Sequence, residues 1–176
     1  QSNTNGVSLH QTDTFFSHSI DTQRLKLREF EHNNSGMLIA YTRADKDLSQ
    51  GAQSTYSIYK TDNPTQLKNV LKAAFGERVV VQKQRELFYV GQTRIHVDVV
   101  QSLIYPLCVE LEVVMPNSDR HHDVRSIIIP GKSGKIDGAS TPKQAKLLIN
   151  SICEYLKIDL NKDCIDCAYA DLIEQN

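Results

Sequence analysis

The sequence predicts an α+β domain made mostly of antiparallel strands, with helices packed outside. Several short segments alternate charged and apolar residues, as in the RLKLR sequence of Arg24–Arg28, and residues two apart on a strand share a face. Two longer segments instead space their apolar residues at helical intervals. The strand segments follow one another after short connections, which favours antiparallel neighbours.

The strand segments are separated by turn residues, with Asn33 and Asn34 in one turn and Gly91 in another. Residues 1–10 are polar and are expected to be disordered, so that a single domain spans 11–176. Strands are expected at Gln11–Phe16, Thr22–Phe30, Met37–Arg43, Thr55–Lys60, Arg78–Val90, Gln92–Val100 and Pro106–Met115. Residues 116–140 are expected to form a loop, with a short strand at Ser126–Ile129 as an alternative for part of it.

Three helices are expected between and after these strands. The first opens at Asn63 and Pro64, where Pro64 suits the first helical turn, and it stops at Gly76. The second covers Pro142–Leu156 and is capped by Thr141. The third is expected at Cys164–Glu174. The apolar stripes of the first two helices are expected to pack against the apolar faces of the strands.

Composition narrows the class of protein. The chain has 176 residues, 40% of them hydrophobic, and a net charge of −1. This charge argues against a nucleic-acid partner, and no apolar run is long enough to cross a membrane. Four cysteines are few for a disulfide scaffold, so a cytoplasmic location is expected. The chain is expected to be a monomer or a homodimer.

Charged residues recur at alternate positions in five of the strand segments. They either face water on an open sheet, which is the usual arrangement, or line a cavity inside a curled sheet. Seven bases against three acids leave a net charge of +4, which is compatible with a triphosphate of roughly four negative charges. The bases are Arg24, Lys26, Arg28, Arg43, Lys83, Arg85 and Arg94, and the acids are Asp98, Glu110 and Glu112.

Eight short motifs occur in the order and spacing of a known family. They are Gln11–Phe16 (QTDTFF), Arg24–Arg28 (RLKLR), Tyr41–Arg43 (YTR), Ser57–Tyr59 (SIY), Lys83–Arg85 (KQR), Gly91–Asp98 (GQTRIHVD), Glu110–Val114 (ELEVV) and Tyr169–Leu172 (YADL). Together they resemble the CYTH superfamily of triphosphate tunnel metalloenzymes, most closely its class IV adenylate cyclase-like branch. Each motif alone is weak, and their combination covers nearly the whole chain.

The resemblance implies an antiparallel β-barrel, or tunnel, whose lumen binds a triphosphate. The family's Glu-x-Glu-x-Lys strand, which precedes the Gln11 segment in other members, has no counterpart in the sequence, so the tunnel is expected to be incomplete. The resemblance implies that Arg24, Lys26, Arg28, Arg43, Lys83, Arg85 and Arg94 bind the triphosphate, with Lys83 and Arg85 acting in catalysis. It also implies that Asp98, Glu110 and Glu112 bind Mg²⁺ or Mn²⁺.

Two functional interpretations remain open at this level. The first is a metal-dependent enzyme, either a triphosphatase or a protein that cyclises ATP to cyclic AMP. The second is a catalytically degenerate phosphate-binding module or scaffold. Alanine in place of Arg28 or Arg85 is expected to weaken triphosphate binding and to leave the fold largely intact.

Overall fold

Seven strands and three helices make up the described part of the chain. The computed structural model describes residues 6–20, 23–43, 54–104, 106–115, 139–160, 162–163 and 168–174. The strands are β1 (Val7–Phe16), β2 (Gln23–Phe30), β3 (Ser35–Arg43), β4 (Ser54–Thr61), β5 (Glu77–Val90), β6 (Thr93–Val100) and β7 (Leu107–Val113). The helices are α1 (Pro64–Phe75), α2 (Pro142–Leu156) and α3 (Tyr169–Glu174).

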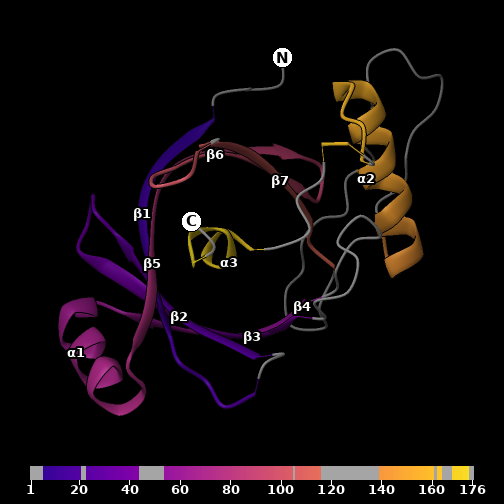
Figure 1. Cartoon of the computed structure of the whole chain (residues 1–176). Helices are drawn as coiled ribbons and strands as arrows, with labels where there is room; N and C mark the ends of the chain where they lie inside the picture. The colour runs from indigo at the N-terminus through magenta and orange to yellow at the C-terminus, as the bar shows by residue number, and fades with distance from the viewer. Residues whose placement is uncertain are drawn as a thin grey trace.

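The strands form one strongly curved antiparallel sheet in the order β4-β3-β2-β1-β5-β6-β7, seen nearly end-on in Figure 1. The predicted α+β class is confirmed, and the described strands do not close into a barrel, which agrees with the expectation of an incomplete one. Among the described residues β4 and β7 are the edges and share no ladder. A side-chain hydrogen bond joins them, from the Tyr56 hydroxyl to Glu112 Oε1 at 2.9 Å.

Several element boundaries differ from the predictions. β1 begins at Val7, because Val7 to His10 pair with β5, so the disordered segment predicted for residues 1–10 extends four residues too far. α3 covers Tyr169–Glu174, and residues 164–167 of the predicted helix lie outside the described residues. The alternative strand at Ser126–Ile129 lies outside the described residues.

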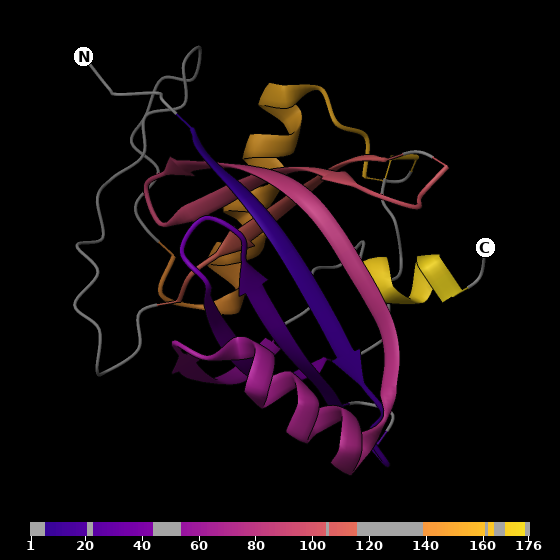
Figure 2. The same cartoon turned by 90° about the vertical axis from the view of Figure 1, so that its left-hand side faces the viewer.

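The first two helices cover the convex face of the sheet, as predicted (Figures 1 and 2). Leu71 of α1 packs in a core with Phe16 and Leu27 of the sheet. Leu148 and Ile152 of α2 form a second core against β5, β6 and β7. Burial of these apolar stripes is what holds the two helices to the sheet.

Local capping explains where these two helices begin. The Asn63 side chain accepts a hydrogen bond from the Gln66 backbone N–H, with Pro64 in the first turn. Thr141 and Gln144 form a reciprocal capping box at the start of α2. Each arrangement satisfies backbone donors that the helix leaves unpaired.

The third helix contradicts the expectation that the helices lie outside. α3 lies within the curve of the sheet (Figure 1), where Ala170 packs with Phe15, Val81 and Val100. Arg78 of β5 binds the carboxylates of Asp171 and Glu174 in the same helix. The concave face therefore has an apolar part, covered by α3, and a charged part.

Candidate anion-binding site

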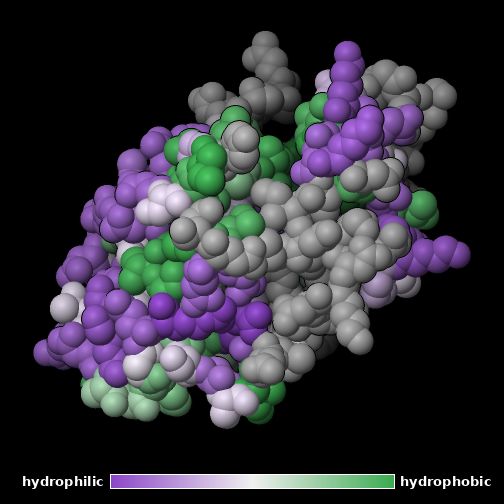
Figure 3. Space-filling view, in the orientation of Figure 1, coloured by the Kyte–Doolittle hydropathy of each residue, from purple (hydrophilic) through white to green (hydrophobic). Residues whose placement is uncertain are grey.

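The charged part of the concave face brings together four basic side chains from two strands. Lys26 and Arg28 lie on β2, and Lys83 and Arg85 lie on β5. β1 runs between these strands and contributes Asp13. Because residues two apart share a face, the alternation read from the sequence places each pair of bases on one side of its strand. Viewed in the orientation of Figure 1, hydrophilic residues predominate over β1, β2 and β5 (Figure 3).

Asp13 is the buried centre of one half of this cluster, with 1% of its surface exposed. Arg28 donates from Nε to Oδ1 and from Nη2 to Oδ2, both at 2.7 Å. Lys26 Nζ donates to Oδ2 at 3.0 Å, and Lys83 Nζ lies 3.6 Å from the same oxygen. Burial opposes ionisation of Asp13, but Arg28 and Lys26 outweigh it and hold the pKa well below its usual range.

Arg85 is the centre of the other half. It donates from Nε to Asp98 Oδ1 at 2.7 Å and from Nη2 to Asp98 Oδ2 at 2.6 Å. Nη2 also donates to Glu110 Oε2 at 2.9 Å. Burial disfavours the guanidinium charge, but the bonds to these carboxylates raise the pKa of Arg85 above its ordinary value. Arg85 is thus held as a cation between a fully buried and a half-exposed acid.

The pKa values of the two lysines are lowered, in contrast to that of Arg85. Burial lowers the pKa of Lys26 to about 8, although Asp13 partly offsets it. Burial also lowers the pKa of Lys83, which is 5% exposed. Lys83 lies over the Tyr169 ring of α3, with Nζ 5.2 Å from the ring centroid. These ammonium groups therefore lose their protons more easily than surface lysines do.

Glu110 and Glu112 lie two residues apart on β7 and share its concave face. His96 Nδ1 lies 3.0 Å from Glu110 Oε2. Burial alone would raise the pKa of Glu110, but His96 and Arg85 keep it well below its usual range. Glu112 accepts a hydrogen bond from Arg94 Nη1 at 3.3 Å as well as the one from Tyr56. Glu110 is therefore held in its ionised form, and each of the two carboxylates has an arginine partner.

Not all of the predicted residues meet in this cluster. Arg94 pairs with Glu112 at the β6–β7 end of the face. Arg24 points instead to Asp171 of α3, at 3.9 Å. The side chain of Arg43 is outside the described part of the structure. The residues that do meet are Lys26, Arg28, Lys83, Arg85, Asp98 and Glu110.

The sequence-based charge count missed Asp13, His96, Tyr56 and Tyr169. Asp13 was visible as a carboxylate at an alternate position of Gln11–Phe16, but its neighbours depend on strand register. Its inclusion changes the electrostatics, because each of the four clustered bases now has a carboxylate partner. The cluster is a compensated ion network, and an incoming anion has to compete with acids already in place.

Burial also changes the expected effect of removing an arginine. Arg85 is 5% exposed and its partner Asp98 is completely buried. Removing one member of a buried ion pair leaves an uncompensated charge, which costs about 3–5 kcal/mol. The expectation that alanine in place of Arg28 or Arg85 leaves the fold largely intact therefore does not fit the ion pairs observed here.

The donor set suits a hard cation only in part. Within the described ranges no three His, Cys, Asp or Glu side chains form a group that could hold a metal ion. Glu110 and Glu112 remain as two carboxylates on one face, while both oxygens of Asp98 are bonded to Arg85. Mg²⁺ commonly binds through one or two carboxylates together with substrate phosphates and water. The pair fits that arrangement.

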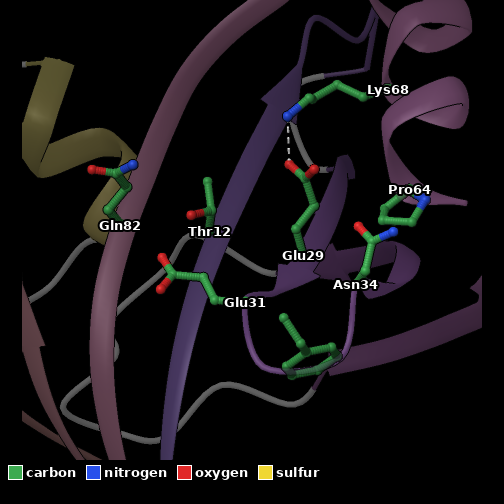
Figure 4. Close-up of a pocket in the computed structure, with 8 residues that line it drawn as sticks. Thr12, Glu29, Glu31, Asn34, Pro64, Lys68 and Gln82 are labelled. Atoms are coloured by element: carbon green, nitrogen blue, oxygen red, sulfur yellow. Dashed lines mark hydrogen bonds and ion pairs between the residues drawn. The ribbon is translucent and has the colours of Figure 1, made fainter. Parts of the chain in front are cut away.

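A separate pocket lies on the convex side, between α1 and the sheet (Figure 4). Its volume is about 300 Å³. Lys68 of α1 forms an ion pair of 2.7 Å with Glu29 of β2 at its wall. Thr12 and Gln82 also line it and alternate with Asp13 and Lys83, so the pocket opens on the face opposite the ion network.

No helix in the described part of the chain is long and apolar enough to span a membrane. No protein-family model matches the sequence, and no curated protein matches it either.

Solved structures share the fold at low sequence identity. The PH1012 protein of Pyrococcus horikoshii superposes with a TM-score of 0.74 at 15% identity, over 97% of this chain and 86% of that one. A proposed adenylate cyclase of Vibrio parahaemolyticus gives 0.66 at 11% identity, over 95% and 81% of the two chains. A proposed adenylyl cyclase of Hippeastrum, described as having a dominant triphosphatase activity, gives 0.61 at 12% identity, over 99% and 85%. The chain thus shares its fold with these proteins, two of which are described as proposed adenylate or adenylyl cyclases.

Proposed function

We propose that this protein binds a triphosphate-containing small molecule together with Mg²⁺ or Mn²⁺ on the concave face of its sheet. The observation that carries the proposal is the convergence of Lys26, Arg28, Lys83 and Arg85 on two buried acids, Asp13 and Asp98. Basic side chains on a solvated sheet would diverge into water, whereas these are largely buried and point toward one another. Arginine and lysine held in this way suit phosphate oxygens.

The chemistry proposed for the site follows from these charges. Lys83 and Arg85 are the candidates for stabilising charge that moves onto a leaving phosphate. Glu110 and Glu112 are the candidates for holding the divalent cation, and Asp98 positions Arg85. When bound, the cation would neutralise phosphate oxygens. Water as the nucleophile would give hydrolysis, and a ribose 3′-hydroxyl would give cyclisation.

Fold similarity favours the same class of ligand. The Hippeastrum protein is described as having a dominant triphosphatase activity. A triphosphatase and a cyclase would bind the triphosphate through the same basic side chains. The second candidate, a module that binds without turnover, is favoured by the ion network itself, in which every clustered base already has an acid partner. These acid partners weaken the electrostatic attraction between the clustered bases and a polyanion.

Turnover assays and thermal shifts with one set of ligands separate these candidates. The purified chain is incubated with tripolyphosphate or ATP in Mg²⁺ or Mn²⁺, and phosphate, pyrophosphate and cyclic AMP are measured. An enzyme releases product, and Lys83→Gln abolishes it while Lys143→Gln, on the exposed surface of α2, does not. A binding module shows no product but a higher melting temperature with tripolyphosphate. If the chain shows no product and no stabilisation by tripolyphosphate, the proposal is refuted.

A further inference from the structure

The ion network contains one contact that a bound cation would break. Arg85 has two acid partners of very different exposure: the Asp98 side chain is completely buried, and the Glu110 side chain is 52% exposed. Asp98 binds Arg85 through two parallel hydrogen bonds, and Glu110 does so through one. Asp98 is therefore the permanent partner, and Glu110 is the partner that solvent or a ligand can reach.

We infer that Glu110 occupies Arg85 in the ligand-free protein and releases it when a divalent cation binds, so that cation and triphosphate bind cooperatively. The inference rests on the proposed function and goes beyond it by assigning a regulatory role to one residue. The oxygen concerned is Glu110 Oε2, which is 2.9 Å from Arg85 Nη2. A cation that takes this oxygen leaves Nη2 with only its bond to Asp98.

Each ligand alone meets an obstacle in this arrangement. A triphosphate without the cation has to displace Glu110 from Arg85 and then lies beside the displaced carboxylate, which repels it. A cation without the triphosphate meets the positive charge of Arg85 at Glu110 and of Arg94 at Glu112, with two carboxylates as its protein ligands. Bound together, the cation neutralises the acids and the phosphates neutralise the arginines.

Glu112 extends the same exchange to the edge of the sheet. It lies 3.3 Å from Arg94 and accepts the hydrogen bond from Tyr56 on β4. A cation that engages both glutamates would therefore also compete for the side-chain bond between the edge strands. The exchange thus links ligand occupancy to the contact between β4 and β7.

Calorimetry of tripolyphosphate binding tests the inference without any need for turnover. Titrations are run in EDTA and in Mg²⁺ on the wild type, Glu110→Gln and the charge-matched control Glu86→Gln, which lies on the opposite face of the sheet. Wild type and control should bind about tenfold or more tightly in Mg²⁺ than in EDTA. Glu110→Gln should bind more tightly than wild type in EDTA, and its gain from Mg²⁺ should fall below about threefold. Comparison within one buffer removes the effect of the complex that Mg²⁺ forms with tripolyphosphate in solution.

The possible outcomes separate this inference from the proposed function. No wild-type binding in either buffer would overturn the proposed function. Wild-type binding with equal affinity in both buffers, or weaker binding by Glu110→Gln in EDTA, would overturn the exchange alone. If Glu110→Gln does not fold, Glu110→Asp serves instead, since it keeps the charge and shortens the reach to Arg85. That variant should also bind more tightly than wild type in EDTA, and weaker or unchanged binding counts against the exchange.

Discussion

Asp13 and Arg28 face each other across β1 and β2 and form a two-point ion pair, with both N–O distances at 2.7 Å. Lys26 and Lys83 approach the same carboxylate, so three bases share one buried acid. Asp13 is therefore the electrostatic centre of the concave face, and its removal tests whether the network holds the fold together.

Asp13→Asn should lower the free energy of unfolding by about 3–5 kcal/mol, because it leaves buried cations without their acid. Urea denaturation measures the change, with Asp62→Asn at an exposed position as the control. Tripolyphosphate should raise the melting temperature of Asp13→Asn more than that of the wild type, since the anion replaces the lost charge. A loss below about 1 kcal/mol, typical of a surface pair, would show that the network contributes little.

Arg85 and Asp98 should behave as a coupled pair. Arg85→Met alone should cost about 3–5 kcal/mol of stability, because the buried carboxylate of Asp98 loses both of its hydrogen bonds from Arg85. The double variant Arg85→Met with Asp98→Asn should lose less than the two single changes added together, with a coupling of about 1–3 kcal/mol. Additive losses in urea denaturation would contradict the pairing.

Lys26 should make triphosphate binding depend on pH. With a pKa of about 8, its ammonium group is partly deprotonated above that pH, and a bound anion favours the protonated form. Binding at pH 8–9 should therefore take up a proton, and affinity should fall as the pH rises further. The binding enthalpy is measured by calorimetry in buffers of different ionisation enthalpy, and its dependence on the buffer gives the number of protons taken up. Lys26→Arg, which stays charged, should reduce the uptake, and an unchanged proton count in that variant would place the titration elsewhere.

Acid should destabilise the fold through the carboxylates of the network. Asp13 and Glu110 have pKa values below their ordinary ones, so the unfolded chain binds more protons than the folded one in the acid range. Their contribution is complete above about pH 5 and is lost as the pH falls through the folded values. Urea denaturation from pH 7 down to pH 3 should show this loss. The free energy of unfolding should fall less steeply with decreasing pH in Glu110→Gln than in Glu86→Gln. Equal slopes in the two variants would contradict the lowered pKa of Glu110.

The third helix should depend more on apolar contacts than on its ion pairs. Tyr169 packs against the core of Phe15, Val81 and Val100, so Tyr169→Ala should cost about 3–5 kcal/mol. Arg78→Ala removes partly exposed ion pairs and should cost about 1 kcal/mol or less. Urea denaturation of the two variants gives the comparison, and the reverse order of losses would mean that Arg78 is the main anchor of α3.

The sequence alone determined which residues share a face and where the capped helices begin. Lys26 and Arg28 were placed together because the period of a strand is two, and that rule is local. The start of α2 was equally readable, since Thr141 and Gln144 meet within one turn. The α+β class and the positions of most strands followed from such short-range patterns.

Only the tertiary structure decided which charges neutralise each other and where the sheet ends. Asp13 meets Arg28 because β1 and β2 pair in one particular register, and Arg85 meets Glu110 across β6. α3 was expected outside with the other helices, yet Ala170 and Tyr169 complete an apolar core on the concave face. These outcomes depend on strand order, register and curvature, which arise from contacts between residues far apart in the chain, and alternation within one segment carries no information about them.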